Sequence, residues 1–341
     1  MLVEQRLGEA VLADGTQVSY AVAGRGPVAI YVPGWVSHLE LGWAVPAERG
    51  LYEGLAADRT LVRYDRPGCG LSGATSRTDV ADLELEVIEA VAAAVGAERF
   101  DLIGSSFGAP LAARWAARRP ETVSRLVLYG GWVDGGSVAA PEVRQHVLGL
   151  VEQHWGLASD VLTEIFAPDA DAAFRAAFSR YQRESATAQV ARQLLAACYD
   201  LDITADLDHI TAQTTVIHRV GDRAAPVSEG ERLAAGVPGA RLERLDGRTH
   251  IPFAGDVTAV MNAMRGGLGL APLKADAPPT LTPRQREVAA LVAAGYSNRQ
   301  IAEALVITER SAESHVERIR IRLGFRSRAQ IAAWYVVSSS S

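Results

Sequence analysis

The stretch DLIGSSFG, Asp101–Gly108, decides how most of this chain folds. Its first residues are apolar and predict a short strand, and the five residues from Gly104 to Gly108 follow the pattern G-x-S-x-G. A serine in such a strand-to-helix turn presents its hydroxyl clear of the backbone, and the glycines let neighbouring segments pass close by. We expect the helix at residues 107–119 to point its positive N-terminal end at whatever Ser106 attacks. The alternative is an ordinary turn without a chemical role, because the pattern fixes only three small residues.

Length and composition predict a globular chain with one large and one small domain. The chain has 341 residues, of which 48% are hydrophobic. It has no apolar run long enough to span a membrane and no leader-like N-terminus, so we expect a cytoplasmic protein without a membrane partner. The two cysteines, Cys69 and Cys198, are too few for a disulfide framework and are interpreted as packing residues. Nothing in the sequence predicts a cofactor or a metal.

Charge is distributed unevenly along the chain. Residues 280–341 hold nine Arg and five Glu, a net charge of +4. Residues 1–279 hold 25 basic and 35 acidic groups, a net charge of −10, which together give the −6 of the whole chain. An acidic body with a basic tail predicts that the tail meets a polyanion and the body does not.

Extended apolar runs alternate with helical patterns over most of the chain. The runs occupy residues 8–24, 28–35, 60–64, 123–132, 214–222 and 240–245, and the helical patterns 52–58, 80–95, 228–235 and 255–265. This alternation predicts an α/β fold with a doubly wound, mostly parallel sheet. Ligands of such sheets bind beyond the carboxyl ends of the strands, where we expect Trp35, Ser106, Phe107 and Trp132.

Residues 137–207 interrupt this alternation with an Ala-rich, helical pattern. A helical insert between sheet strands is expected to cover the ligand pocket as a lid. A helical elaboration elsewhere on the surface is the alternative. The aromatic residues of the insert are interpreted mainly as lid core; they are Trp155, Phe166, Phe174, Phe178 and Tyr181.

A reactive serine hydroxyl needs a base, and the base needs a residue that orients it. Asp222 and His250 each follow a late predicted strand, which gives the chain order Ser106, Asp222, His250. Asp134 is the alternative acid. The backbone N–H groups of Phe107 and Trp35 are the candidate oxyanion hole. Candidate ligand contacts are Trp35, His38, Phe107, Trp132 and Trp155, and the tryptophans favour an apolar or aromatic ligand.

This part of the chain resembles the α/β-hydrolase family. The resemblance is carried by residues 33–35, 64–72, 104–108, 221–222 and 246–253, which read PGW, YDRPGCGLS, GSSFG, GD and DGRTHIPF. It implies Ser106 as nucleophile, Asp222 as acid and His250 as base, acting on an ester, lactone or similar acyl carbon. Pro33 departs from the family, many members of which have His before the Gly.

The basic tail contains the pieces of a helix-turn-helix. Thr282-Pro283 is a helix start, and helical patterns follow at residues 287–294, 298–305, 308–323 and 327–337, with Gly295 and Gly324 as stops. Ala312, Val316, Ile319 and Leu323 recur at helical spacing on one face. A small helical interaction domain is the alternative from pattern alone.

The tail resembles the LuxR/FixJ-type helix-turn-helix family in the segments LTPRQREV, GYSNRQIA, ITERS, SHV and RLGFRSR. The resemblance implies that the third helix enters the major groove of duplex DNA and that the fourth, with Ile331, Trp334 and Val337, pairs in a homodimer. The candidate DNA contacts are Arg299, Thr308, Arg310, Glu313, Ser314, Glu317, Arg318 and Arg322. Glu313 replaces the Lys usual in the family, and with Glu317 it is expected either to accept from cytosine or to repel phosphates.

We therefore expect a hydrolase-type domain at residues 1–266, with its lid at about 137–207, a linker at 267–279, a DNA-binding domain at 280–337 and a disordered tail at 338–341. The first interpretation is a one-component transcriptional regulator that senses a small molecule. The second is a serine hydrolase whose tail only localises or dimerises it, and the third combines sensing with slow turnover. The fusion favours regulation, and the complete set of three catalytic residue types favours acyl chemistry.

Overall fold

The computed structural model describes residues 4–273, 281–323 and 327–338, and divides the chain into two compact units, residues 1–273 and 274–341. The linker expected at 267–279 lies in part outside the described residues, because the description of the first unit ends at Leu273. The same holds for Gly324, the predicted stop of the third tail helix, and for residues 339–341.

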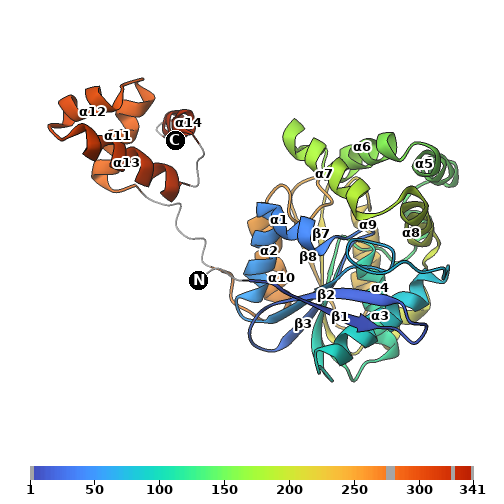
Figure 1. Ribbon diagram of the computed structural model, residues 1–341. Coiled ribbons are helices and arrows are strands. Elements are labelled where there is room, and N and C mark those ends of the chain that lie inside the picture. Colours follow the sequence, from blue (N-terminus) through green and yellow to red (C-terminus); the bar gives the residue numbers. More distant parts are fainter. Residues whose placement is uncertain (1–3, 274–280, 324–326, 339–341) are drawn as a thin grey trace. The chain divides into compact units, whose positions relative to one another are not determined.

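The first unit is built around one eight-stranded sheet, in the order β1-β2-β4-β3-β5-β6-β7-β8 (Figure 1). Its strands are β1 Arg6–Val11, β2 Gln17–Gly24, β3 Val28–Val32, β4 Thr60–Tyr64, β5 Phe100–Ser105, β6 Val123–Tyr129, β7 Gln213–Arg219 and β8 Arg241–Leu245. The pairs β1–β2 and β2–β4 are antiparallel, and all later neighbours are parallel. The predicted α/β fold with a mostly parallel sheet is confirmed.

Helices cover both faces of the sheet. The side chains of β3 point alternately to the two faces and are apolar on both, so both faces have to be covered. Ile30 and Val32 pack in the core cluster with α3 (Val80–Ala94), α4 (Gly108–Arg118) and α9 (Val227–Gly236). Ala29 and Tyr31 point to the other face, where α2 (Pro46–Ala56) and α10 (Val257–Gly267) lie. Successive side chains of a strand point to opposite faces, so a strand buried on both faces reads as a continuous apolar run.

The segment between β6 and β7 is helical. It comprises the short turn η1 (Gly135–Ser137), α5 (Pro141–Gln153), α6 (Trp155–Phe166), α7 (Ala172–Ser185), α8 (Ala188–Asp200) and η2 (Thr204–His209). These helices lie beyond the carboxyl ends of the strands (Figure 1). Cys198 in α8 and Cys69 in the loop after β4 pack as small apolar residues, since both are buried and unpaired.

Several boundaries differ from the prediction. The helix expected at 52–58 begins at Pro46, because Pro46 occupies the first helical position, and a short helix, α1 (Leu39–Ala44), precedes it. The strand expected at 28–35 ends at Val32, before Pro33 and Gly34. The strand expected at 123–132 ends at Tyr129, because Gly130 has a φ of +59° that strand backbone does not adopt.

The second unit contains four helices within its described residues: α11 (Pro283–Ala293), α12 (Asn298–Leu305), α13 (Glu309–Arg322) and α14 (Arg328–Ser338). Thr282 and Ser297 begin α11 and α12 with capping boxes, in which Gln285 and Gln300 return the hydrogen bond. Helix α14 includes Ser338, which falls in the tail expected to be disordered. In the described ranges, every helix is too short or too polar to span a lipid bilayer.

Candidate functional site

Ser106 stands at the turn between β5 and α4 in a strained backbone conformation. Its φ is +55°, and of the described residues other than glycine only Val306 shares a positive φ. Such a conformation costs free energy and persists where the surrounding structure fixes it. The Ser106 N–H donates to the Tyr129 carbonyl at 2.8 Å, which ties the turn to the end of β6.

The two glycines of the turn are required by close packing. A Cβ on Gly104 would lie 2.4 Å from the Gly108 carbonyl oxygen, and one on Gly108 would lie 2.2 Å from the Val32 carbonyl oxygen. Any larger residue at either position would push α4 away from β3 and β5. The G-x-S-x-G pattern here therefore has the strand-to-helix context that a nucleophile turn needs.

The structure brings Ser106, His250 and Asp222 together in one hydrogen-bonded chain. The Ser106 Oγ lies 2.7 Å from His250 Nε2, and His250 Nδ1 lies 2.7 Å from Asp222 Oδ2. With Nδ1 protonated toward the carboxylate, Nε2 is free to accept the serine proton. Asp134, the alternative acid, instead accepts from the Gly136 N–H at 2.8 Å in η1.

Asp222 is held as an anion in a buried setting. Burial raises the pKa of its carboxyl, but the interactions with His250, His218 and the Ala224 N–H together outweigh this and hold the pKa below its usual value. The N–H groups of Ala224 and Ala225 donate to Oδ1 at 2.9 and 3.2 Å. The neighbouring His218, which no sequence motif indicates, places its Nε2 3.0 Å from the Ala225 carbonyl oxygen and 3.7 Å from Asp222 Oδ2.

A buried arginine fixes the loop that carries His250. The Arg219 guanidinium donates to the carbonyls of Thr249, Ile251 and Ala254 at 2.7, 3.0 and 2.7 Å. A second tie comes from the end of α6, because the His250 N–H donates to a lid carbonyl, that of Phe166, at 2.7 Å. Sequence reasoning missed Arg219, and its position inside an apolar strand was the available signal, since a buried arginine needs several acceptors.

A second buried arginine holds the turn that supplies the candidate oxyanion hole. Arg66 donates from Nε to the Gly34 carbonyl at 2.7 Å and from one terminal nitrogen to the Pro33 carbonyl at 2.6 Å. Its other terminal nitrogen forms an ion pair of 2.5 Å with Glu84, and its guanidinium lies 4.9 Å from the centre of the Phe107 ring.

This arrangement orients the Trp35 N–H. The Gly34 carbonyl and the Trp35 N–H belong to the same trans peptide group and point in opposite directions, so fixing the carbonyl on Arg66 turns the N–H away from it. A Cβ on Gly34 would lie 3.7 Å from the Ser106 Cβ, which places this peptide beside the serine. In the described part of the chain, the N–H groups of Trp35 and Phe107 make no protein hydrogen bond and are available to an oxyanion.

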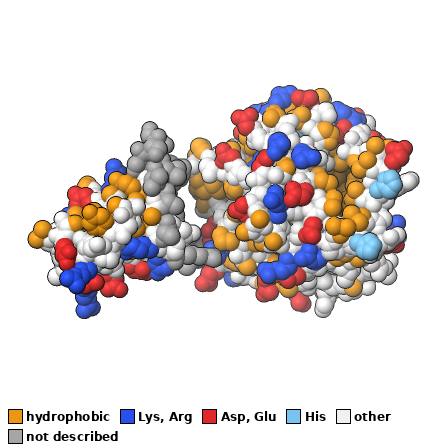
Figure 2. Space-filling model, turned by 90° about the horizontal axis from the view of Figure 1, so that it is seen from above, with side chains coloured by type: hydrophobic (Ala, Val, Ile, Leu, Met, Phe, Trp, Pro, Cys, Tyr) orange, Lys and Arg blue, Asp and Glu red, His pale blue; other side chains and the backbone are white. Residues whose placement is uncertain are grey.

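An apolar cavity of about 190 Å³ opens on one side of Ser106 and His250. Helices α5, α6 and α8 supply much of its lining, including Val143, Val147, Leu162, Ile165, Leu195 and Tyr199. Trp35 and Trp132 add aromatic surface. Figure 2 shows hydrophobic side chains around a hollow of the larger unit, within a surface where both signs of charge are mixed.

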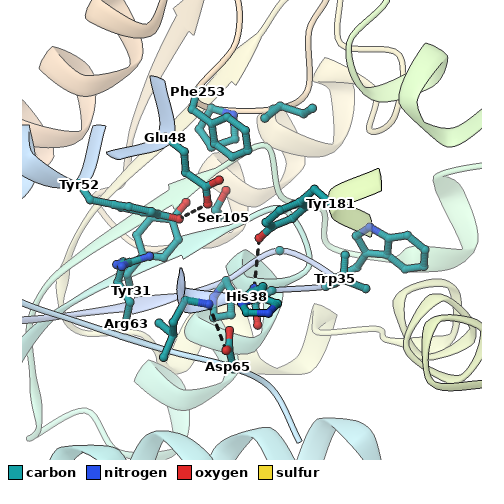
Figure 3. A pocket seen from close by; sticks show the side chains of 18 of the residues that line it. Tyr31, Trp35, His38, Glu48, Tyr52, Arg63, Asp65, Ser105, Tyr181 and Phe253 are labelled. Carbon is teal, nitrogen blue, oxygen red and sulfur yellow. Dashed lines mark hydrogen bonds between the residues drawn. The ribbon is translucent and has the colours of Figure 1, made fainter. Parts of the chain in front are cut away.

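A second, smaller chamber of about 80 Å³ is also lined by Ser106 and His250, and its walls combine apolar and polar side chains (Figure 3). Its polar lining includes Tyr31, His38, Glu48, Tyr52, Arg63 and Tyr181. Trp35 and Phe166 line both spaces. Phe178 and Tyr181, interpreted from the sequence as lid core, also face this chamber.

Two of the predicted ligand contacts lie elsewhere. Phe107 is fully buried and stacks on Trp132 with ring centres 6.3 Å apart, so its backbone and not its ring faces the site. Trp155 packs edge-on against Trp35, and its Nε1 donates to the Ala186 carbonyl at 3.0 Å, so it supports the pocket wall from behind. Trp35, His38 and Trp132 are lining residues.

The second unit packs its four described helices around a small core of its own. Val288, Ile301, Ala312, Ile319 and Ile331 are buried there. Ala312 and Ile319 come from the predicted apolar face of α13, and Val316 and Leu323 pack against the same core. The opposite face of α13 is left toward solvent.

Among the predicted DNA-contacting residues whose side chains the structure describes, most are exposed. Arg310, Glu313, Glu317 and Arg318 are exposed on α13, and Ser314 is half-buried. Arg299 pairs with Glu303 at 3.1 Å and Glu317 with Arg320 at 2.6 Å. The Thr308 Oγ1 accepts from the Ser311 N–H at 3.2 Å and caps α13. The side chain of Arg322 lies outside what the structure describes.

The predicted pairing helix contributes to the core of its own unit. Ile331 is fully buried there, and Trp334 packs against the same core, so Ile331 is not available to a second copy. The Val337 side chain lies outside the described part. Arg328 at the start of α14 donates to the Asn298 side chain at 2.6 Å and to the Tyr296 carbonyl, which fastens α14 to the start of α12.

Two family models match the chain, one in the first unit and one in the second. The model described as alpha/beta hydrolase family matches residues 29–264, and the model described as bacterial regulatory proteins, luxR family, matches residues 279–335.

Curated relatives match the first unit. A polyketide synthase, ThaQ, from Burkholderia thailandensis is 28% identical over 253 residues; the match covers 71% of this chain but 12% of the synthase. A 2-hydroxy-6-oxononadienedioate/2-hydroxy-6-oxononatrienedioate hydrolase from Pseudomonas putida is 26% identical over 248 residues, covering 68% of this chain and 80% of that protein. Among solved structures, a bromoperoxidase from Bacillus anthracis aligns with a TM-score of 0.69 and 19% identity over 77% of this chain and 100% of that one, a similarity of fold.

Proposed function

We propose that this chain, which belongs to the alpha/beta hydrolase family and carries a luxR-family regulatory domain at residues 279–335, is a transcriptional regulator whose hydrolase-type unit binds and hydrolyses a small apolar ester or lactone. The observation that carries the proposal is the hydrogen-bonded chain of Ser106, His250 and Asp222, at 2.7 Å for each step, on the same polypeptide as a DNA-binding fold.

The chemistry follows from the positions of these atoms. The Ser106 Oγ attacks the acyl carbon while His250 Nε2 takes its proton, and Asp222 stabilises the imidazolium that forms. The carbonyl oxygen becomes an oxyanion that accepts from the N–H groups of Phe107 and Trp35. As the tetrahedral species collapses, the alkoxide leaves with the proton from His250. A water molecule then attacks the acyl-serine by the same route and releases the acid.

The larger cavity supports an apolar acyl or alcohol portion in the ligand. Its walls are aliphatic and aromatic, and apolar surface removed from water stabilises a complex by about 25 cal/mol per Å². Of the relatives' activities we transfer only the general class, hydrolysis.

The second unit supports the regulatory half of the proposal. We propose that α13 enters the major groove of duplex DNA and that Arg299, Thr308, Arg310 and Arg318 contact phosphates or base edges. We further propose a homodimer on a two-fold operator and a cytoplasmic location, where bacterial DNA is accessible. Ile331 has no part in that dimer, because it is buried within its own unit.

A second candidate function is a serine hydrolase whose tail only localises or dimerises it. The complete serine–histidine–aspartate geometry favours it, because a receptor that only binds its ligand needs no base. A combined function, in which slow turnover resets the sensor, is supported by both the serine–histidine–aspartate geometry and the DNA-binding fold.

One pair of measurements on full-length wild type and Ser106→Ala tests the proposal. Wild type is expected to hydrolyse short p-nitrophenyl esters, with turnover reduced about a thousandfold or more in the variant. Both proteins are expected to bind duplex DNA, with an affinity that falls as salt increases. Equal turnover in the two proteins would refute the hydrolytic role, and absence of duplex binding at low ionic strength would refute the regulatory role.

A further inference from the structure

We propose that Glu48 makes the smaller chamber a recognition site for a hydrogen-bond-donating group of the ligand, a hydroxyl or an ammonium, and that it disfavours a carboxylate there. The inference rests on the proposed function only in assuming that the ligand reaches Ser106. Its evidence is separate, because it concerns the chamber and not the reacting atoms.

Glu48 is buried on the pocket side of α2, with 3% of its surface exposed. Its Oε1 accepts from the Tyr52 hydroxyl at 2.8 Å. Its Oε2 is also buried and has no hydrogen-bond partner among the described residues. In Figure 3 the carboxylate lies between Tyr52 and Ser105, with Tyr181 opposite. A buried acceptor without a donor is costly, so a ligand that brings a donor gains that missing hydrogen bond.

The neighbouring charges do not supply this donor. Arg63 donates to the Gln5 side chain and places its guanidinium 3.9 Å from the centre of the Tyr52 ring. In the described structure it forms no ion pair with a carboxylate. Asp65 Oδ2 accepts from the N–H groups of Leu39 and Leu71 at 3.1 and 2.9 Å, whereas its Oδ1, like Glu48 Oε2, is buried without a hydrogen-bond partner among the described residues. Glu48 Oε2 and Asp65 Oδ1 are thus the carboxylate oxygens of the chamber lining that can accept from a ligand, and the Glu48→Gln variant distinguishes between them.

A single ligand can fill both spaces. The chamber and the apolar cavity share Ser106, His250, Trp35 and Phe166 in their linings, so they meet at the nucleophile. The preferred ligand therefore carries an apolar portion on one side of its reacting carbon and a small donor group on the other. A carboxylate in the chamber would face Glu48 as a like charge and offer no proton.

The ionisation of Glu48 makes ligand binding sensitive to pH. Burial raises the pKa of Glu48 to about 7, although the hydrogen bond from Tyr52 opposes the rise. Above that pH the group is an anion and attracts an ammonium, and below it the group is neutral. The titratable and charged groups around Glu48 are Tyr52 on α2, Tyr31 on β3, Arg63 on β4, Asp65 after β4, His38 before α1 and Tyr181 on α7.

Three ligands of equal chain length test the inference by calorimetry on the full chain at pH 8: hexylammonium, 1-hexanol and hexanoate. We expect at least one of the two donors to bind about tenfold or more tightly than hexanoate, the size of one charge-assisted hydrogen bond. The Glu48→Gln variant keeps the shape and is expected to lose this preference, because its amide also donates. Glu53→Gln, on the same helix but outside the chamber lining, is the matched control and is expected to retain it.

The pH dependence separates the two donors. Hexylammonium is expected to bind more tightly as the pH rises from 6 to 8 in wild type, but not in Glu48→Gln, whereas 1-hexanol is expected to change less in both proteins. Hexanoate binding as tightly as both donors, or a preference unchanged by Glu48→Gln, would overturn the inference. These ligands are not hydrolysed, so a missing preference in a protein that still turns over esters refutes this inference alone, and a preserved preference without turnover refutes the hydrolytic role alone.

Discussion

Arg66 links most of the elements that prepare the oxyanion hole. Its guanidinium holds the carbonyls of Pro33 and Gly34, pairs with the buried Glu84 and lies over the Phe107 ring. A charged donor on the Gly34 carbonyl fixes the peptide plane and polarises it, which makes the Trp35 N–H a stronger donor. We therefore assign Arg66 a positioning role at the scale of single residues.

Replacing Arg66 by lysine is expected to lower kcat for ester hydrolysis by about ten- to a hundredfold with little change in KM, somewhat less than the loss of a whole oxyanion donor. A lysine keeps the charge for Glu84, but its single ammonium does not reproduce the planar fork. Arg59→Lys is the control, because Arg59 also pairs with a buried carboxylate, that of Asp101, away from the turn. A folded Arg66→Lys protein with kcat within twofold of wild type would contradict the assignment.

The sequence predicts the three candidate catalytic residues, because their order along the chain is characteristic. It does not predict the residues that only position them. Ser106, Asp222 and His250 follow three strands in sequence, and this order with the turn motif is enough to select them. Arg66 lies in the motif at residues 64–72 and Arg219 stands inside an apolar strand, but neither pattern indicates what these residues hold, and Glu48 has no sequence signal. Their roles depend on carbonyls and hydroxyls from segments far apart in the chain, which only the fold brings together.

At the scale of elements, the turn between α12 and α13 carries local strain. Val306 ends α12 with φ +54° and ψ +52°, and 91% of its surface is exposed. A β-branched residue is a poor choice for the left-handed region, where glycine is usual. Because the Val306 side chain is exposed, packing within this unit does not compensate for the backbone strain.

The Val306→Gly substitution is expected to stabilise the second unit by up to about 1 kcal/mol, because relief of the strain exceeds the added entropy of the unfolded chain. Protection of the α12 and α13 amides in hydrogen exchange measures this locally. Val306→Ala is the control: it retains a Cβ and therefore most of the strain. Equal protection in Val306→Gly and Val306→Ala would argue against strain at this turn.

Substitution of Glu313 tests which face of α13 contacts DNA. It is exposed, one turn before the equally exposed Glu317. The Glu313→Lys substitution is expected to increase the non-specific affinity for duplex DNA. The slope of log affinity against log salt concentration should become steeper by roughly one unit, because one new phosphate contact releases about one counterion. Glu121→Lys makes the same charge change at an exposed position of the first unit. Weaker or unchanged binding by Glu313→Lys would place this face away from the DNA.

Elements of strong periodicity are predicted well, whereas their ends depend on single residues. The strand Thr60–Tyr64 and the helix Asn298–Leu305 have the predicted bounds. Helix α1 was missed, because six residues are too few to establish a helical period. Ile331 of α14 is predicted to pair with a second copy but packs in the core of its own unit, since an apolar stripe does not reveal whether a neighbouring helix or a second copy covers it.

At the scale of the whole molecule, one chain joins a serine–histidine–aspartate site in a hydrolase-type unit to a luxR-family unit. The lid is tied directly to the first of these, because the end of α6 accepts the backbone N–H of His250. A ligand that displaces α6 would therefore move the base as well. Hydrolysis by this chain requires that Ser106 be activated in the intact protein.

The most direct measurement is the intact mass of the full-length protein after incubation with a fluorophosphonate, for wild type and Ser106→Ala in parallel. An activated serine displaces fluoride and retains the phosphonyl group. The account predicts one adduct on wild type and none on the variant. An unmodified wild type, or the same adduct on both proteins, would contradict it.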